Sequence, residues 1–256
     1  MGNKKIDFTE QRTKNCENLM NLEAKALLDV SLDEKIAKSK EIIKEALAKY
    51  PKIGLGFSGG TDSLVLLHLA LPLLSENTPI IFVDTQHEFP ETYEFINKVV
   101  KEWNLKNFHT VKAEEDKLEK LVDKFGLKTA DFTAICCGYH KIAPMMKAIG
   151  DFGLDAFLVG LRGVEHEERA KEVFFSPRKN PDHLRVHPLL FWRKSDILDY
   201  VKKNNIECNP LYARGYTSLG CVVCTEKNPD PNAHERAGRG VVREEIMKRL
   251  RDLGYT

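Results

Sequence analysis

From residue 51 onward, short apolar runs alternate with helical stretches, and this alternation constrains the fold more than any other feature. Buried strands are expected at four places, namely 53–57, 79–84, 107–112 and 156–161. Helices are expected between and after them, at 63–74, 90–103, 115–125, 139–149 and 195–204. Strands that are joined by helices pair in parallel, so the pattern predicts an α/β fold with a doubly wound, mainly parallel sheet. Such sheets bind ligands at the carboxyl ends of their strands.

Two flanking segments complete the predicted organisation. Residues 1–50 are expected to be helical, because Ser31-Leu32-Asp33-Glu34 has the form of a capping box before an apolar helical face. Tyr50-Pro51 ends that segment. The α/β domain then covers 51–205, and a tail over 206–256 is rich in Gly, Pro, Asn and Arg and carries a CxxC. We expect this tail to be a lid or a metal-bearing appendage.

Composition excludes some classes of function. The 256 residues contain 39 basic and 38 acidic side chains, a formal net charge of +1, which does not indicate a general attraction to nucleic acid or membrane. No apolar run approaches the ~20 residues of a membrane span. We therefore expect a cytoplasmic protein. In that reducing compartment its six cysteines are expected to be metal ligands or reactive thiols rather than disulfides.

The first expected strand runs directly into a turn without bulky side chains, in the stretch IGLGFSGGTDS at 53–63. Gly59 and Gly60 permit close backbone approach and positive φ. Successive amides in such a turn, at the amino end of the following helix, form an anion-binding concavity. Ser58, Thr61 and Ser63 add hydroxyl groups. The turn is therefore predicted to bind a phosphate or pyrophosphate group.

The turn has neither the Walker pattern nor Gly-x-Gly-x-x-Gly. It resembles the PP-loop of the adenine nucleotide α-hydrolase-like superfamily, whose members bind ATP or an adenylylated compound. That resemblance implies that the phosphate or sulfate groups are bound by Ser58, Gly59, Gly60, Asp62 and Ser63.

Two further stretches resemble the phosphoadenylyl-sulfate (PAPS) reductase family. VDT at 83–85, followed by FPETY at 89–93, implies that Asp84 and Thr85 lie beside the adenosine. GLRGVEHEERAK at 160–171 sets Arg162 and Arg169 seven residues apart after a buried strand. Guanidinium groups bind sulfate and phosphate oxygens in pairs, so we interpret these two arginines as a catalytic clamp on the anionic end of the ligand.

The cysteines indicate a branch of that family. Cys136 and Cys137 are adjacent, and Cys221 and Cys224 form the CxxC. Four thiolates in two pairs are compatible with a zinc ion or an iron–sulfur cluster. CCGYHKIAPM, NPLYARGYTSLGCVVCT and ERAGR resemble segments of the adenylyl-sulfate (APS) reductase branch, which implies one [4Fe-4S] cluster bound by these four cysteines.

The sequence departs from the family pattern at one point. Thiol-dependent reductases of this family carry a nucleophilic cysteine in a C-terminal motif, which forms an S-sulfocysteine that thioredoxin later releases as sulfite. No cysteine follows Cys224 here, and Cys208 is the only spare thiol nearby. The leading interpretation is a PAPS/APS reductase-like enzyme of sulfur metabolism that binds APS or PAPS, with thioredoxin as a possible thiol donor.

Two alternatives stay open. One is an ATP pyrophosphatase or adenylyltransferase that uses ATP with Mg²⁺, since RVHPLLFWRKSDILDYV resembles the small subunit of sulfate adenylyltransferase. The other is a nucleotide- and redox-sensing subunit without catalysis. The family resemblance also implies a homodimer.

Overall fold

A computed structural model describes residues 8–228, 230 and 233–254. At its centre lies a six-stranded sheet of order β3-β2-β1-β4-β6-β5. The strands are β1 (Ile53–Gly56), β2 (Ile80–Val83), β3 (Phe108–Val111), β4 (Ala156–Leu158), β5 (Phe175–Arg178) and β6 (His183–Val186). Neighbouring strands are parallel except for β5 and β6, which are antiparallel. The predicted α/β class with a mainly parallel sheet is confirmed.

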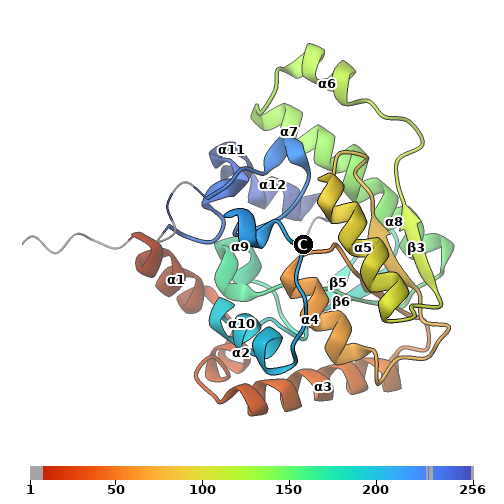
Figure 1. The fold of residues 1–256 in the computed structure, drawn as a ribbon, viewed down its shortest axis with the longest axis vertical. Helices are drawn as coiled ribbons and strands as arrows, with labels where there is room; N and C mark the ends of the chain where they lie inside the picture. Colours follow the sequence, from red (N-terminus) through yellow and green to blue (C-terminus); the bar gives the residue numbers. More distant parts are fainter. Residues whose placement is uncertain (1–7, 229, 231–232, 255–256) are drawn as a thin grey trace, which may run out of the picture.

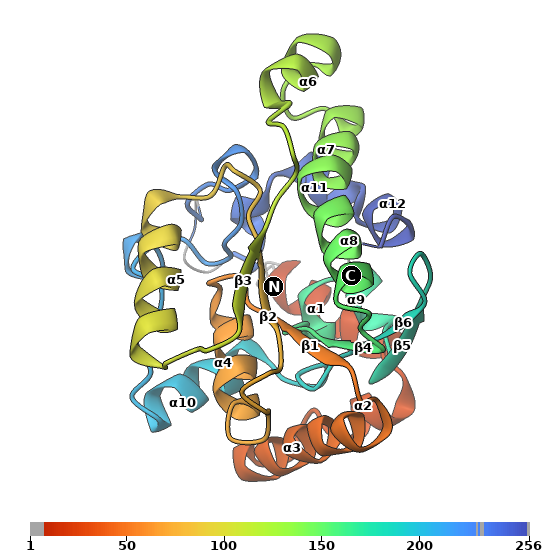
Figure 2. The same ribbon diagram turned by 90° about the vertical axis from the view of Figure 1, so that its right-hand side faces the viewer.

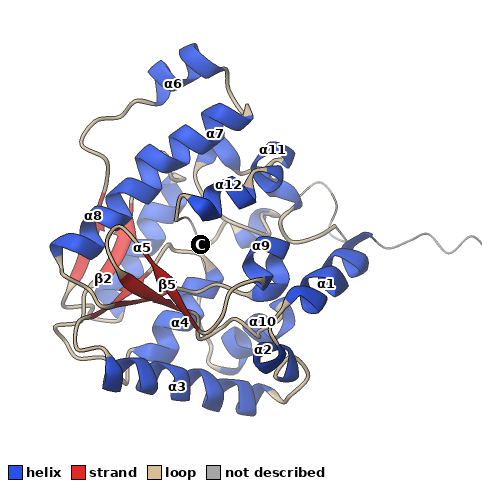
Figure 3. Cartoon of the chain, turned by 180° about the vertical axis from the view of Figure 1, so that it is seen from behind, coloured by secondary structure: helices blue, strands red, loops and turns tan. Residues whose placement is uncertain are grey.

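Helices cover both faces of the sheet (Figures 1 and 2). Figure 2 shows α4 (Thr61–Ala70) and α5 (Pro90–Glu102) on one side and α8 (Ala143–Asp151) on the other. On the first side, α3 (Leu32–Lys49) and α10 (Lys194–Lys203) pack against α4. Figure 3 shows the short strands enclosed by these helices. The sheet therefore has a buried core on each face.

The alternation of side chains along each strand separates the two cores. In β2, Ile80 and Phe82 belong to the larger core beneath α3, α4 and α5. Ile81, between them, belongs to the smaller core beneath α8, together with Phe157 of β4. Successive side chains of a strand point to opposite faces, so both faces need apolar residues. This requirement explains the continuous apolar runs in the sequence.

The described part of the amino-terminal segment is mostly helical. It forms α1 (Phe8–Leu19), α2 (Leu22–Ala26) and α3, while residues 1–7 of the predicted helical segment lie outside the described residues. The capping box before α3 is present: the Ser31 hydroxyl accepts from the Glu34 amide at 3.3 Å, and the Glu34 carboxylate accepts from the Ser31 amide at 2.9 Å. Among the described helices, none is long and apolar enough to cross a bilayer.

Some elements were not expected. The β5–β6 hairpin lies in the stretch after Gly163, where the pattern of strands and helices becomes irregular, and β6 pairs in parallel with β4. The expected helix at 139–149 is part of a longer arrangement: α7 (Ala130–Cys137), a π-helical turn η1 (Gly138–Ile142) and α8. The stretch expected as helix from 115 contains α6 (Leu118–Phe125).

The tail after residue 206 is mostly short helical turns. These are η3 (Tyr212–Arg214), η4 (Val222–Cys224), η5 (Ala237–Arg239), α11 (Val241–Glu245) and α12 (Met247–Asp252). Two further short helices, η2 (Gly163–Glu165) and α9 (Glu167–Ala170), precede the hairpin. Both α11 and α12 pack against α7. The tail therefore returns to the carboxyl edge of the sheet, where the predicted site residues lie.

Candidate active site

The glycine turn connects β1 to α4, and only one of its two adjacent glycines has a backbone conformation that favours glycine. Gly59 has φ +74°, and a Cβ there would lie 3.1 Å from Ile96. Gly60 has an ordinary φ of −81° as the N-cap of α4 and offers no side-chain cap. Of the two glycines that permit positive φ, only Gly59 adopts it. The amino end of α4 is left without a capping side chain.

Hydrogen bonds within the turn fix its two serines. The Ser63 hydroxyl accepts from the Ser58 amide at 3.2 Å and donates to the Gly60 carbonyl at 2.9 Å. The two serine hydroxyls are 3.1 Å apart. On the outer side, the Thr61 amide donates to the Tyr212 hydroxyl at 3.0 Å, so the tail element η3 contacts the turn directly.

Gly160, at the end of β4, approaches the turn closely. A Cβ on this residue would lie 2.8 Å from both the Asp62 carbonyl oxygen and the Ser63 amide nitrogen. Real Cβ atoms do not approach backbone so closely, so a side chain here would displace the first turn of α4. Gly160 is thus the residue that permits the segment after β4 to pack against the glycine turn, and sequence reasoning did not single it out.

A cavity of about 210 Å³ opens beside the turn at the carboxyl edge of the sheet. One wall is apolar and contains Ile81, Val83 and Phe157 from the strands and Met145 from α8. Six cationic side chains and four carboxylates also line it. They are Lys141, Arg169, Arg185, Lys194, Arg236, Arg239, Asp62, Glu88, Glu165 and Glu235.

Of the predicted site residues, this cavity brings together Ser58, Gly60, Asp62, Ser63 and Arg169. Gly59 lies in the turn behind them. An apolar wall facing a cationic, amide-rich rim matches a ligand with a flat base at one end and anionic groups at the other.

Arg162 is fully buried and is surrounded by carboxylates. Its Nε donates to Asp62 at 3.0 Å, and its Nη2 donates to Glu235 at 2.6 Å. Glu165 lies 3.6 Å from the same Nη2. Burial raises the pKa of Asp62, although Arg162 and Lys194 act to lower it. Arg162 therefore holds Asp62 and the tail residue Glu235 in place; its Nη1 is buried without a hydrogen-bond partner among the described residues, and its role as a clamp stays a prediction.

Arg169 does line the cavity. It forms an ion pair with Glu165, whose carboxylate also lies 3.9 Å from Arg236. Burial opposes the ionisation of Glu165, but Arg169, Arg162 and Arg236 hold its pKa below the usual range. The Nε of Arg169 is buried without a hydrogen-bond partner among the described residues. This N–H is available to a ligand.

Arg185 of β6 has a different environment. It is 1% exposed, and no carboxylate lies within ion-pair distance of it among the residues that the structure describes. Its guanidinium donates to His183 at 3.1 Å and to the Gly254 carbonyl at 3.2 Å. Burial lowers its pKa to about 9. Glu172 acts on this cation only from beyond ion-pair distance, and a buried cation of this kind at a cavity wall attracts an anionic ligand.

Asp84 and Thr85 do not line this cavity. The Asp84 carboxylate accepts from the Tyr93 hydroxyl and from the Gln86 amide, both at 2.7 Å. Thr85 donates to Glu88 at 2.8 Å and borders a smaller cavity, of about 20 Å³, at the cysteines. Both residues thus organise the loop after β2, and their contact with adenosine stays a prediction.

The four predicted metal ligands come from two segments. Cys136 and Cys137 end α7, while Cys221 is the N-cap of η4 and Cys224 is its last residue. Cys136, Cys137 and Cys221 border the smaller cavity, and Cys221 and Cys224 share a hydrogen bond. Lys141 and Arg239 line both this cavity and the larger one. The cysteines therefore adjoin the candidate nucleotide site.

Arg243 of α11 connects the tail to the cysteines. Its Nη1 donates to the Cys137 thiol at 3.0 Å. Burial raises the pKa of Cys136 to about 12, whereas a hydrogen bond from Cys221 lowers that of Cys224 to about 7. Cys208 is separate: it is half-buried, does not border either cavity, and burial raises its pKa.

Sequence reasoning missed the cavity residues of the later chain. Lys194, Tyr212, Glu235 and Arg236 reach the site from α10 and from the tail. Lys194 is held with its Nζ 5.3 Å from the centre of the Tyr212 ring. Two of them, Glu235 and Arg236, belong to the ERAGR segment, which was used only as evidence for the family resemblance.

Comparison with known proteins agrees with this arrangement. The family model described as "Phosphoadenosine phosphosulfate reductase domain" matches residues 52–227. The chain is 30% identical over 219 residues to adenosine 5'-phosphosulfate reductase 2 of Bacillus subtilis (strain 168), covering 85% of this chain and 91% of that protein.

Two solved structures share the fold. The phosphoadenylyl-sulfate reductase of Candida auris, a phosphate complex, has a TM-score of 0.60 at 23% identity, covering 78% of this chain and 92% of that one. The FMN adenylyltransferase of Candida glabrata, with FAD and inorganic pyrophosphate, has a TM-score of 0.62 at 19% identity, covering 96% and 92%. The fold, the site and the matches together show that this chain belongs to the phosphoadenosine phosphosulfate reductase family, within the PP-loop superfamily.

Proposed function

We propose that the larger cavity binds an adenylyl sulfonucleotide, APS or PAPS, as the substrate of a reductase-like reaction. The observation that carries this proposal is the joining, in one cavity, of the amino end of α4, whose N-cap Gly60 offers no side chain, a set of cations and an apolar wall. The amides of the turn and the helix dipole would bind the phosphate group. The base would occupy the apolar wall.

Each end of the ligand has matching groups. The Arg169 Nε and the guanidinium of Arg185 provide N–H groups for the anionic end. Lys194 lies on the same rim, where Asp62 and Glu235 raise its pKa against the effect of burial. Arg162 would act indirectly, by keeping Asp62 and the tail at the cavity.

We also propose that Cys136, Cys137, Cys221 and Cys224 bind one [4Fe-4S] cluster. The support is chemical: Cys136, Cys137 and Cys221 border one small cavity, Cys224 shares a hydrogen bond with Cys221, and the cations Arg243, Arg239 and Lys141 line the same cavity. Binding would replace the thiol protons, and nearby cations favour an anionic cluster. Such a cluster would place an anionic group beside the cavity, next to Lys141 and Arg239.

The cluster has its own test. Protein purified without oxygen should be brown, with a broad absorbance shoulder that dithionite changes little, and should contain about four iron and four sulfide ions per chain. Cys221→Ser should lose the colour, whereas Cys208→Ser should retain it. Colourless wild-type protein with about one zinc ion would contradict the cluster.

Sulfite formation needs thiols. In the family's reaction a thiolate attacks the sulfate sulfur and releases AMP, and a second thiol then displaces sulfite and leaves a disulfide. No cysteine follows Cys224 in this sequence, and Cys208 does not border either cavity. We propose that a separate donor such as thioredoxin supplies the attacking thiol.

Product analysis tests the reaction. With APS or PAPS and a reduced thiol donor, we expect sulfite and the corresponding adenosine nucleotide, at a rate that depends on donor concentration. Incubation with ATP and Mg²⁺ should release no pyrophosphate. Pyrophosphate release without sulfite would instead establish the adenylyl-transfer reaction, and tight nucleotide binding with neither product would establish a sensing role.

A further inference from the structure

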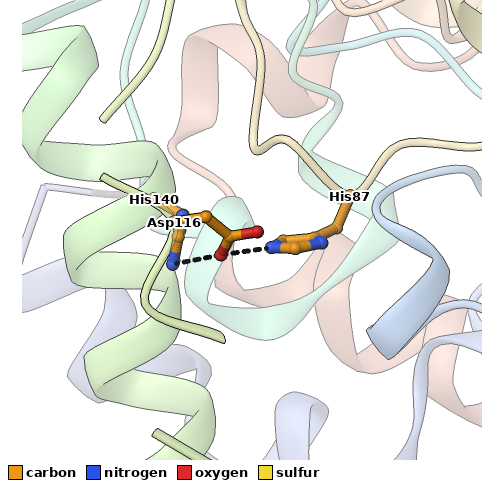
Figure 4. Close-up of side chains that lie close together, drawn as sticks. All are labelled: His87, Asp116 and His140. Atoms are coloured by element: carbon orange, nitrogen blue, oxygen red, sulfur yellow. Dashed lines mark hydrogen bonds and ion pairs between the residues drawn. The ribbon is translucent and has the colours of Figure 1, made fainter. Parts of the chain in front are cut away.

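His87, Asp116 and His140 form a cluster next to the cysteines, since His87 and His140 also border the smaller cavity there. They come from the loop after β2, the loop after β3 and the π-helical turn η1. Their nearest ligand atoms all lie within 4.8 Å of one another. Figure 4 shows the Asp116 carboxylate between the two imidazole rings, 3.0 Å from His87 Nε2 and 3.8 Å from His140 Nε2.

His140 provides a second, independent observation. Its residue is 1% exposed, and neither of its ring nitrogens has a hydrogen-bond partner among the described residues. A buried polar group without a partner is costly and calls for an explanation. Burial also lowers the pKa of His140, so the ring keeps a free lone pair at neutral pH. A neutral imidazole that faces a carboxylate and a second imidazole can bind a metal ion together with them.

The surrounding backbone holds the three side chains in place. The His87 carbonyl accepts from the Val222 amide at 2.8 Å, which ties its loop to the CxxC segment. The Asp116 carboxylate accepts from the Leu118 amide at 2.9 Å. His140 lies in a π-helical turn, a local distortion that is frequent at functional sites.

Nearby cations do not occupy the cluster. Lys117 lies 4.3 Å above the Tyr139 ring and pairs with Glu115 at 3.9 Å. The Asp116 side chain is 47% exposed, which leaves one side of the cluster open to solvent. An ion therefore has both a negatively charged ligand and an entry route.

We propose that His87, Asp116 and His140 bind one divalent transition-metal ion such as Zn²⁺, separately from the four cysteines. Two imidazole nitrogens and one carboxylate are typical ligands for such ions, and three protein ligands leave a position open for water or another group. Mg²⁺ and Ca²⁺ prefer sites built from oxygen. The ion would join the β2 and β3 loops to the turn that follows Cys137. This site stands independently of the proposed reaction.

Co²⁺ is a suitable probe, because its spectrum distinguishes nitrogen and oxygen ligands from thiolates. One equivalent of Co²⁺, added without oxygen to the purified protein, should give weak visible bands in the difference spectrum without intense sulfur-to-metal charge transfer. Zn²⁺ should displace it. The Asp116→Asn, His87→Gln and His140→Gln variants should each weaken binding at least about tenfold.

The control is His109→Gln, a histidine of β3 whose Nε2 is engaged by Asn107 at 2.6 Å. It should bind Co²⁺ as the wild type does. Iron and sulfide content should be unchanged in Asp116→Asn, an isosteric change at an exposed carboxylate that tests the site even where His140→Gln fails to fold. Unchanged Co²⁺ affinity in Asp116→Asn, thiolate charge-transfer bands, or the absence of a saturable equivalent in the wild type would each overturn the proposal.

Discussion

Two buried arginines at the candidate site, Arg162 and Arg185, have opposite surroundings. Arg162 lies among the carboxylates of Asp62, Glu165 and Glu235, and no carboxylate lies within ion-pair distance of Arg185 among the described residues. Removing one partner of a buried ion pair leaves an uncompensated charge, whereas replacing an unbalanced buried cation by an apolar group removes a desolvation cost. Substitution of the two arginines should therefore change the free energy of unfolding by different amounts.

We expect Arg162→Gln to lower the free energy of unfolding by about 3–5 kcal/mol, because three carboxylates lose their common partner. Arg185→Met should leave it nearly unchanged or raise it, while weakening the binding of anionic ligands. Urea denaturation of both variants at pH 7 measures the difference. Equal losses of stability in the two variants would contradict the prediction that its carboxylate partners give Arg162 the larger contribution to stability.

Gly160 permits a backbone contact that any side chain would block. A Cβ 2.8 Å from the Asp62 carbonyl and the Ser63 amide must push the turn aside, so Gly160→Ala should cost about 1–3 kcal/mol of stability and weaken nucleotide binding. Gly150→Ala in α8 is the matched control, since the nearest atom there is 3.9 Å away, on Pro181. Denaturant unfolding and nucleotide titration are the measurements, and wild-type affinity in Gly160→Ala would refute this function of Gly160.

Sequence reasoning located the glycine turn and the two cysteine pairs because each is a short local pattern. It did not find the partners of Arg162, since Glu235 lies 73 residues further along the chain. The same reason hid the cluster of His87, Asp116 and His140, which unites three loops. Contacts between distant segments depend on the fold, and no short pattern in the sequence predicts them.

At the scale of elements, α11 is joined to the cavity wall by a charged network. Its Glu244 accepts from Arg236 at 2.7 Å and from Arg12 of α1 at 2.7 Å. Burial opposes ionisation, but Arg236, His166 and Arg12 lower the pKa of Glu244 from 4.5 to about 2. This carboxylate therefore links the amino-terminal helix, the tail and the site.

The network predicts an acid dependence. A carboxyl group with a lowered pKa in the folded state contributes stability above its unfolded pKa, and that contribution is lost as the pH falls from about 4.5 toward 2. The shift corresponds to about 3 kcal/mol. Glu244→Gln should lose stability at pH 7 and show a flatter decline between pH 5 and 3. The exposed Glu245→Gln is the control, and parallel acid profiles for wild type and Glu244→Gln would contradict the prediction.

The elements that sequence reasoning missed share a physical cause. Strand β6 contains His183 and Arg185, so its charged residues interrupt the apolar run that marks a buried strand. Strand β5 contains Pro177, which cannot donate to a ladder and suits its place at the edge of the sheet. These two strands are stabilised by pairing with each other and, for β6, with β4. The propensities of single residues do not predict such pairing.

For the whole molecule, the sheet edge, α8 and the returning tail together enclose one cavity, and Lys141 and Arg239 connect it to the cysteines. The tail residues Tyr212, Glu235 and Arg236 complete a wall that the α/β domain alone lacks. Ligand binding and the position of the tail should therefore depend on each other. A sulfonucleotide that binds here should protect the tail from proteolysis.

Calorimetric titration of the anaerobic protein with APS tests the proposed binding site most directly. One APS per chain should bind at least about tenfold more tightly than AMP, because the sulfate adds charge-assisted hydrogen bonds at the cationic rim. Arg185→Met should reduce that preference while its fold remains stable. An APS affinity no greater than that of AMP, or a preference unaffected by Arg185→Met, would contradict the assignment of this cavity to a sulfonucleotide.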